Sequence, residues 1–242
     1  MEQRNKMENL SENYAPFSVK KSIIIAIDGP AASGKSTTAR LLAKRLGYLY
    51  LDTGAMYRAF TWKVLNNKID INNKESLSKL AKRTKIYLEP EDRIGTKVYL
   101  DGEEITSFVR SPQVNKYVSL VSMVGGVREE MVRQQREIGK RGGVVAEGRD
   151  IGTVVFPKAE VKIFLTCSLE ERARRRWREE MERNSCSTKK EVKVELSLRD
   201  KLDEERELSP LKKADDAIIL DNTFLSINET VGKVLKIARD SL

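Results

Sequence analysis

The sequence predicts an α/β domain whose core is a parallel β-sheet with helices on both faces. Two observations lead to this fold class. Short apolar segments alternate with helical ones along the 242 residues, and a glycine-rich loop separates the first apolar segment from the first helix. The composition, with 40% hydrophobic and 33% charged residues, is that of a globular chain with a real core.

Five short apolar segments are expected to form the strands of this sheet. Their near-continuous apolar character is typical of parallel strands buried on both faces, and each is far shorter than the ~20 residues that cross a bilayer. The segments are 22–28 (SIIIAID), 48–52 (YLYLD), 143–147 (GVVAE), 161–166 (VKIFLT) and 217–220 (AIIL).

Helical segments lie between and after these strands. The first, 36–46, ends before Gly47, which is a suitable C-cap. Others are predicted at 168–183 and 188–207, and residues 225–242 form an amphipathic helix that closes the chain.

The long interval between the second and third strands predicts an insert. A simple crossover between parallel strands needs only about a dozen residues. Here "KIYLE" and "KVYLDGEEI" show strand alternation, with Asp-Gly as a turn sequence, and Ser111-Pro112 opens a helix. We therefore expect a small α+β insert at 85–124, a core of 21–84 and 125–242, and a flexible polar tail at 1–20.

The loop after the first strand is a phosphate-binding motif. Gly29 to Ser36 fits G-x-x-x-x-G-K-[ST] and has the required strand before it and helix after it. Successive backbone N–H groups and the helix N-terminus attract oxyanions. Lys35 can reach the β- and γ-phosphates, and the Ser36 hydroxyl can bind Mg²⁺. The chain is therefore predicted to bind a nucleoside triphosphate.

The composition excludes several classes of enzyme. The chain has no histidine, which removes Ser-His-Asp hydrolases, papain-like proteases and histidine-ligated zinc enzymes. Cys167 and Cys186 have no metal-like or redox-like spacing, and the polar N-terminus is no signal peptide, so we expect a reduced, cytoplasmic protein. The net charge of +9 fits nucleic acid or a small polyphosphate, and the interleaving of basic with acidic residues favours the polyphosphate.

Two other nucleotide-binding classes share such a loop. Asn67-Lys68-Ile69-Asp70 matches the guanine-reading pattern of GTPases, but it follows the helical segment 57–66 instead of a later strand, so a chance match is favoured. An ATP-driven motor would need an acidic residue after a strand, which Glu147 could supply, and an oligomerising module, which nothing in the sequence suggests.

Polar residues follow the second and third strands, where the carboxyl ends of a parallel sheet border a ligand crevice. Asp52, Thr53 and Arg58 could bind a sugar and a second phosphate, or they could form a capped helix with a surface arginine; the residues leave both open. Arg149, beside Gly148, is suited to phosphate because its planar fork donates two parallel hydrogen bonds.

Two further groups of charges lie on predicted helices. The 168–183 segment carries six arginines and five glutamates, and it is either a solvated helix with Glu170–Arg174 and Glu171–Arg175 pairs or a lid over phosphates. Arg199, Asp203 and Arg206 share one helical face, so that Asp203 could orient both guanidinium groups. From the residues alone, a surface ladder is favoured for these three.

Together these residues resemble the bacterial cytidylate kinases, which are nucleoside monophosphate kinases of the P-loop kinase fold. The matching segments occur in the family's order: "IDGPAASGKST", "LDTGAMYR", "VRSPQV", "VREEMVRQQR", "EGRDIGTVVFP", "KIFLTCS" followed by "EERARRR", and "LSPLKKADDAIILDNTFLS". The resemblance implies a five-stranded parallel sheet, a monophosphate-binding insert, a helical lid around 170–190, and transfer of the γ-phosphate of ATP to CMP or dCMP.

The resemblance also implies the roles of individual residues. Arg58, Arg128 and Arg149 would grip the acceptor phosphate, and Ser119, Arg128 and Asp203 would read cytosine. The ATP-binding set is Gly29, Pro30, Ala31, Ala32, Ser33, Gly34, Lys35, Ser36 and Thr37, with Ser36 as the Mg²⁺ ligand. The catalytic set is Lys35, Arg149, Arg175 and Arg176. The acceptor-binding set is Asp52, Thr53, Arg58, Ser119, Arg128, Gly148, Arg149, Arg199, Asp203 and Arg206.

The departures from the family are small. Thr53 stands where the family also uses serine, and Glu147 stands where some members have aspartate, which leaves the carboxylate that supports Mg²⁺ open. The family implies a monomer that binds neither nucleic acid nor membrane. The alternatives are a P-loop kinase for another acceptor, such as UMP, dTMP, AMP or shikimate, and an ATP-dependent RNA-binding or regulatory protein.

Overall fold

A computed structural model describes residues 22–91, 95–182 and 187–241. The predicted tail at 1–20 lies outside these residues. Within them, no helix combines the length and the apolar character that crossing a membrane requires.

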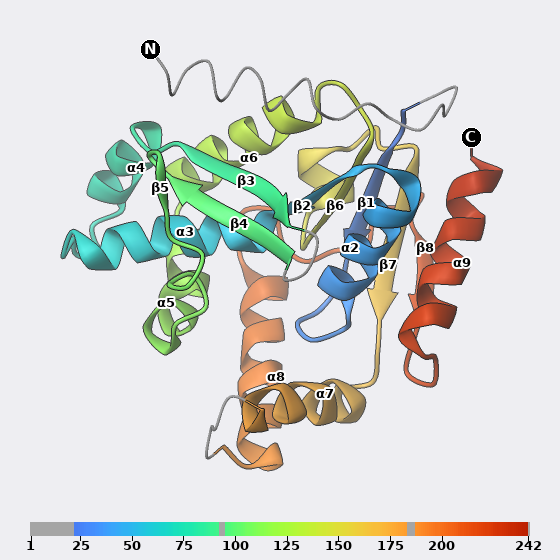
Figure 1. The fold of residues 1–242 in the computed structure, drawn as a ribbon. Coiled ribbons are helices and arrows are strands. Elements are labelled where there is room, and N and C mark those ends of the chain that lie inside the picture. The colour runs from blue at the N-terminus through green and yellow to red at the C-terminus, as the bar shows by residue number, and fades with distance from the viewer. Residues whose placement is uncertain (1–21, 92–94, 183–186, 242) are drawn as a thin grey trace.

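The five predicted strands form one parallel sheet, which confirms the predicted fold class (Figure 1). Their order is β2-β6-β1-β7-β8, so the first strand of the chain lies in the middle of the sheet. The register pairs Asp28 with Gly148 and Asp52 with Glu147, which brings the carboxyl ends of β1, β2 and β6 together. The strands are β1 (Ile24–Asp28), β2 (Leu49–Asp52), β6 (Val144–Gly148), β7 (Val161–Thr166) and β8 (Ile218–Asp221).

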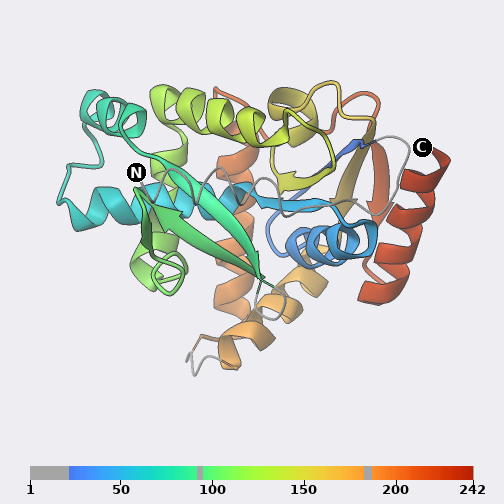
Figure 2. The same ribbon diagram turned by 45° about the horizontal axis from the view of Figure 1, so that its top comes forward.

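Helices cover both faces of this sheet because successive side chains of a strand point to opposite faces (Figures 1 and 2). On β1, Ile25 and Ile27 are buried in a core shared with α2 (Lys35–Leu46) and α9 (Ile227–Asp240). Ala26, between them, belongs to the core of the other face. That face is covered by α3 (Thr53–Asn66) and α6 (Gly125–Gly139).

A second, antiparallel sheet lies in the region predicted as the insert. Its strands are β3 (Ile86–Glu91), β4 (Gly95–Leu100) and the short β5 (Glu103–Glu104), in that order. Asp101 and Gly102 join β4 to β5 with φ values of 51° and 97°, the left-handed conformations of a tight hairpin turn. The helices α4 (Lys74–Lys82) and α5 (Pro112–Ser122) flank this sheet in sequence, and Ser111 caps α5 as its Ser-Pro sequence predicts.

Two helices lie beyond the carboxyl ends of the main sheet (Figure 1). They are α7 (Leu169–Met181), capped by Ser168, and α8 (Lys189–Glu205), capped by Thr188 in a capping box. A short π-helical turn, η1 (Ile151–Val155), follows β6. The sequence Asn67–Asp70 follows α3 and no strand, so the structural context of a guanine-reading motif is missing.

Candidate active site

A cavity of about 820 Å³ opens at the carboxyl ends of the strands, between the phosphate loop, α5 and the helices α7 and α8. Most of the predicted site residues line it. They are Ala31, Ala32, Gly34, Lys35, Ser36, Thr37, Asp52, Thr53, Arg58, Ser119, Arg128, Gly148, Arg149, Arg175, Arg176, Arg199, Asp203 and Arg206. Gly29, Pro30 and Ser33 belong to the loop but do not line the cavity.

The phosphate loop has the tight backbone that its glycines predict. Gly29 has a φ of 150°, and a Cβ there would lie 2.1 Å from the carbonyl oxygen of Leu165, so no other residue fits. Gly34, with a φ of 90°, is the N-cap of α2. The positive end of α2 therefore points at the loop, which is the arrangement that binds oxyanions.

Lys35 is buried at the first turn of α2. Its Nζ donates hydrogen bonds to the carbonyl oxygen of Pro30 at 2.6 Å and to Ser33 Oγ at 3.3 Å. Burial, followed by the positive charge of Arg149, lowers the pKa of Lys35 to about 7. An anion in the cavity would stabilise the protonated form, so this lysine is placed to meet a phosphate.

An oxygen-rich group lies beside the loop. Ser36 Oγ donates to Glu147 Oε1 at 2.7 Å, and the Tyr50 hydroxyl lies 3.4 Å from the same oxygen. Burial, followed by the nearby Asp52, raises the pKa of Glu147. Hard oxygen donors of this kind fit Mg²⁺, which commonly takes one or two protein ligands together with phosphate oxygens and water.

Asp28 fixes the segment that follows Arg149. Its carboxylate accepts hydrogen bonds from the backbone N–H groups of Ile151 at 2.8 Å and Gly152 at 2.7 Å, the start of η1. Burial raises the pKa of Asp28 to about 6, although these two hydrogen bonds oppose the shift. Asp28 was missed because the sequence shows only an acidic residue at the end of a strand.

Asp52 organises the side of the cavity near the insert. It caps α3 by accepting from the Ala55 N–H at 2.7 Å, and it pairs with Arg58 at 3.3 Å and Arg110 at 3.2 Å. The cap was one of the two interpretations left open, but Arg58 is not a surface arginine, because its side chain is only 12% exposed. Arg110 was missed: it is recruited from the segment before α5, and no local pattern marks it.

Arg128 and Arg206 meet at Asp150. Arg128 donates to Asp150 and to the Ser122 carbonyl oxygen, and its guanidinium lies 5.3 Å from the centre of the Tyr57 ring. Arg206 Nη2 approaches Asp150 at 3.9 Å. Both arginines are buried, so this wall of the cavity carries two cations that share the Asp150 carboxylate.

Asp203 holds one of the two arginines predicted for it, Arg206, and holds Arg149 in place of the other. It pairs with Arg149 at 2.7 Å and approaches Arg206 at 3.6 Å, and no ion pair joins it to Arg199 among the described residues. The surface-ladder interpretation is wrong, because Asp203 and Arg206 are buried and line the cavity. Burial, followed by the charge of Arg149, lowers the pKa of Arg199 to about 10.

Four buried nitrogens, on arginines that line this cavity, make no hydrogen bond to the described part of the chain. They are Nε of Arg58, Arg128 and Arg199, and Nη2 of Arg206. Buried donors are nearly always paired in folded proteins, so these point to a ligand rich in acceptors. A negatively charged ligand would accept hydrogen bonds from these donors and would also balance the surplus of positive charge in the cavity.

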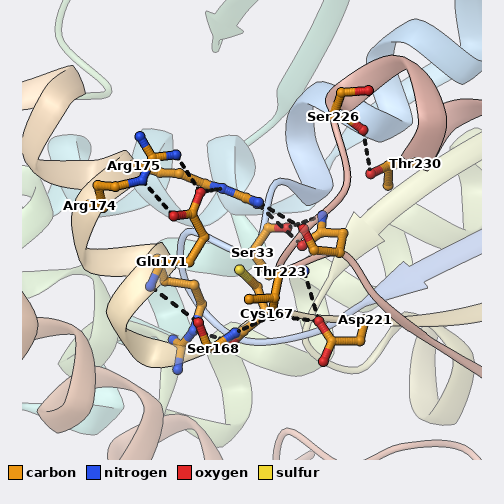
Figure 3. Close-up of polar contacts among 12 residues, drawn as sticks. Ser33, Cys167, Ser168, Glu171, Arg174, Arg175, Asp221, Thr223, Ser226 and Thr230 are labelled. Atoms are coloured by element: carbon orange, nitrogen blue, oxygen red, sulfur yellow. Dashed lines mark hydrogen bonds and ion pairs between the residues drawn. The ribbon is translucent and has the colours of Figure 1, made fainter.

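The arginines of α7 are held by local and tertiary partners (Figure 3). Glu171 lies between Arg174 and Arg175, at 2.5 and 2.9 Å, which confirms the predicted Glu171–Arg175 pair. The predicted Glu170–Arg174 pair is wrong, because Glu170 turns to lysines of α8 instead.

Asn222, after β8, is a site residue that the sequence did not reveal. Its Nδ2 donates to the Ser33 carbonyl oxygen at 2.9 Å, and Arg175 donates to its Oδ1 at 3.2 Å and to its carbonyl oxygen at 2.9 Å. Asn222 therefore joins α7 to the phosphate loop. Arg176, by contrast, pairs within its own helix with Glu180 at 3.0 Å.

Comparison with known proteins identifies the family of this chain. The family model described as cytidylate kinase matches residues 25–240. A cytidylate kinase of Bacillus cereus and one of Bacillus thuringiensis are each 52% identical to this chain over 217 residues, covering 90% of this chain and 96% of the relative. The chain belongs to the cytidylate kinase family.

Proposed function

We propose that this protein transfers the γ-phosphate of ATP to CMP or dCMP, giving ADP and CDP or dCDP. The observation that carries the proposal is the cavity itself. It has a phosphate loop at one end, and buried arginines with unused donors line its wall. The relatives of this chain are named for this activity.

The donor end is the phosphate loop with α2. Residues 29–37 would surround the ATP phosphates through backbone N–H groups, and Lys35 would exchange its contact with the Pro30 carbonyl for phosphate oxygens. Ser36 would hold Mg²⁺, with Glu147 as the carboxylate that supports it. When bound, Mg²⁺ would neutralise charge on the donor phosphates.

The acceptor end is formed by Asp52, Thr53, Arg58, Arg128 and Arg149. Three of these are arginines that line the cavity, and two of the three keep a buried donor without a hydrogen bond. A monophosphate placed among them would satisfy those donors. Asp52 and Thr53 are assigned to a sugar hydroxyl from the family resemblance; in this structure Thr53 Oγ1 donates to the Glu147 carbonyl oxygen at 2.7 Å.

Recognition of cytosine is assigned to Ser119, Arg128 and Asp203. A carboxylate accepts a hydrogen bond from the ring amine of cytosine, whereas the carbonyl oxygen that uracil carries at that position would repel it. The pairing of Asp203 with Arg149 keeps it ionised: burial opposes ionisation, but that arginine lowers the pKa of Asp203 below its ordinary value.

The chemistry requires no general base, which agrees with a chain that has no histidine. The second pKa of a phosphate monoester is ~6, so its oxygen is already ionised at neutral pH. That oxygen attacks the γ-phosphorus, the bond from this phosphorus to the bridging oxygen breaks, and ADP leaves with the electron pair. Lys35, Arg149, Arg175 and Arg176 would stabilise the charge on the transferred group.

Exclusion of water is assigned to two parts of the chain. We propose that the insert at 85–124 binds the monophosphate and that the helices around 170–190 form a lid, both closing on a core of 21–84 and 125–242. Closure would prevent hydrolysis of ATP in place of transfer. A monomeric enzyme in the cytoplasm, without a nucleic-acid partner, is also proposed from the family resemblance.

An acceptor panel tests the function. Release of ADP from ATP and Mg²⁺ is followed by a coupled assay with CMP, dCMP, UMP, dTMP, AMP and shikimate, each with and without RNA. Faster ADP release with CMP or dCMP than with the other acceptors is the expected result. Preference for another acceptor favours the alternative kinase, and release that follows RNA instead of an acceptor contradicts the proposal.

A further inference from the structure

Two buried charged residues contact the phosphate loop without belonging to the predicted site. Arg172 of α7 and Asp200 of α8 are 7% and 8% exposed. Arg172 Nη1 donates to the Ala31 carbonyl oxygen at 3.1 Å and to Asp200 Oδ2. Asp200 Oδ1 accepts from the Ala31 N–H at 3.1 Å. Both backbone polar groups of one loop residue are therefore held by one ion pair.

Arg172 and Asp200 lie beside cavity-lining residues on their own helices. Arg172 lies one helical turn before Arg175, and Asp200 lies between Arg199 and Asp203 on α8. All three of those neighbours line the cavity. The ion pair is thus one point at which the donor loop meets the helices that carry cationic groups and the proposed base-reading group.

Helix packing alone does not account for this ion pair. Ala31, Ala173, Val192 and Leu196 already form a buried apolar cluster between the loop and the two helices. A buried ion pair is often no more stabilising than apolar residues of similar volume. What the pair adds is direction: it fixes the N–H and the C=O of Ala31, next to Ala32, whose φ of 57° is unusual for a residue with a side chain.

We propose that Arg172 and Asp200 are positioning residues for phosphoryl transfer. They hold Ala31 against the N-terminal part of α7 and the C-terminal part of α8. A change of the loop on binding of the donor phosphates is thereby transmitted to the arginines on both helices. The proposal rests on the proposed kinase function. Neither residue needs to touch a substrate.

Kinetics of matched variants test the proposal. Asp200→Asn keeps an acceptor for the Ala31 N–H but removes the charge facing Arg172, and Arg172→Lys keeps the charge but cannot make all its hydrogen bonds. Both are expected to lower kcat by about 10- to 100-fold with smaller changes in KM, because small misplacements of reacting groups have such effects. Asp200→Asn serves as the test if Arg172→Lys fails to fold.

Two controls separate positioning from stability. Val192→Ala weakens the same apolar cluster without touching the ion pair, and Lys193→Gln breaks the ion pair with Glu170, at 2.7 Å, which joins α7 to α8 away from the loop. Both controls should keep kcat near that of the unmutated enzyme at temperatures where they are folded. If Val192→Ala lowers kcat as much as Asp200→Asn at equal loss of melting temperature, the proposal is overturned.

A fluorescence readout works without turnover. Trp177 lies on α7, and its Nε1 donates to the Ser187 carbonyl oxygen at 3.1 Å. In a Trp62→Phe background Trp177 is the remaining tryptophan. Binding of ATP should change the fluorescence emission of Trp177, because the ion pair links the phosphate loop to α7. Asp200→Asn should bind ATP by calorimetry yet lose that change. A change that persists at full size overturns the proposal, whereas an unmutated enzyme that binds ATP but phosphorylates no CMP overturns only the proposed function.

Discussion

Lys35 is a buried cation whose charge can be removed with little change of shape. Lys35→Met keeps an unbranched apolar side chain in the same space and loses the hydrogen bonds to the Pro30 carbonyl oxygen and to Ser33. Because burial lowers the pKa of Lys35 to about 7, the two proteins should differ in how their stability depends on pH.

The sign and size follow from proton linkage. The unfolded chain keeps the Lys35 proton up to about pH 10, whereas the folded protein loses it progressively above pH 7. The unfolded state therefore binds more protons over this range, and the stability of the unmutated protein rises with pH. Between about pH 7 and pH 9 Lys35 is protonated in the unfolded chain but mostly neutral in the folded protein. These two pH units add about 3 kcal/mol to the free energy of unfolding. Lys35→Met has no such contribution.

Urea unfolding at a series of pH values measures this difference. Groups that do not interact with Lys35 cancel in the comparison, and the lost hydrogen bonds add an offset that does not depend on pH. Asp28 and Glu147 do not cancel, because the charge of Lys35 lowers the pKa of each, so their titration also contributes to the difference. The free energy of unfolding of the unmutated protein, relative to Lys35→Met, should rise by about 3 kcal/mol from pH 6 to pH 9. Parallel curves would refute the buried, neutralised lysine. The variant should also lose turnover, and an active Lys35→Met enzyme would remove the phosphate-loop assignment.

Three further substitutions probe the rest of the site. Arg149→Lys keeps a charge beside Asp203 but loses the planar fork, so kcat should fall by about 10²- to 10³-fold with little change in melting temperature; a proportional loss of both would indicate a structural role. Asp203→Asn should raise the KM for CMP by about 10-fold or more, through loss of a charged hydrogen-bond acceptor, and should raise the KM for UMP less; equal increases would exclude base reading. Glu147→Gln removes the charge beside Ser36 and should raise the Mg²⁺ concentration for half-maximal rate by about 10- to 100-fold; an unchanged Mg²⁺ titration would exclude the supporting role.

The sheet and the phosphate loop could be predicted because their causes are local. Apolar runs of strand length between helical segments have few alternatives to a parallel sheet, and the loop motif carries its own strand and helix. Even the turn at Asp101-Gly102 and the cap at Ser111 follow from residue type. In each case the residues that determine the structure are neighbours in sequence.

The wrong pairings have a common cause. Spacing along a helix predicted Glu170 with Arg174, and Asp203 with both Arg199 and Arg206. The Asp203–Arg206 pair is present at 3.6 Å, but the other two are not, because each acidic residue pairs with a group from elsewhere. Glu170 meets Lys193 on the facing helix, and Asp203 meets a residue 54 positions earlier in the chain. A helical pair contributes only ~0.2–0.5 kcal/mol, so tertiary partners readily displace it.

The missed site residues are those that only the fold brings together. Asn222 reaches the loop from the far end of the chain, and Arg110 reaches Asp52 from the insert. Asp28 and Tyr50 act through hydrogen bonds to segments more than 90 residues away. No local pattern distinguishes such residues from surface or core ones, so their roles emerge only once the sheet order is known.

The central claim is that one cavity holds two nucleotides end to end, with their phosphates between Lys35 and the buried arginines. Calorimetry with a compound that joins adenosine to cytidine through five phosphates measures this directly. One molecule should bind per chain, more tightly than ATP or CMP alone, and the saturated protein should bind neither nucleotide. Binding of ATP or CMP to the saturated protein would contradict the claim.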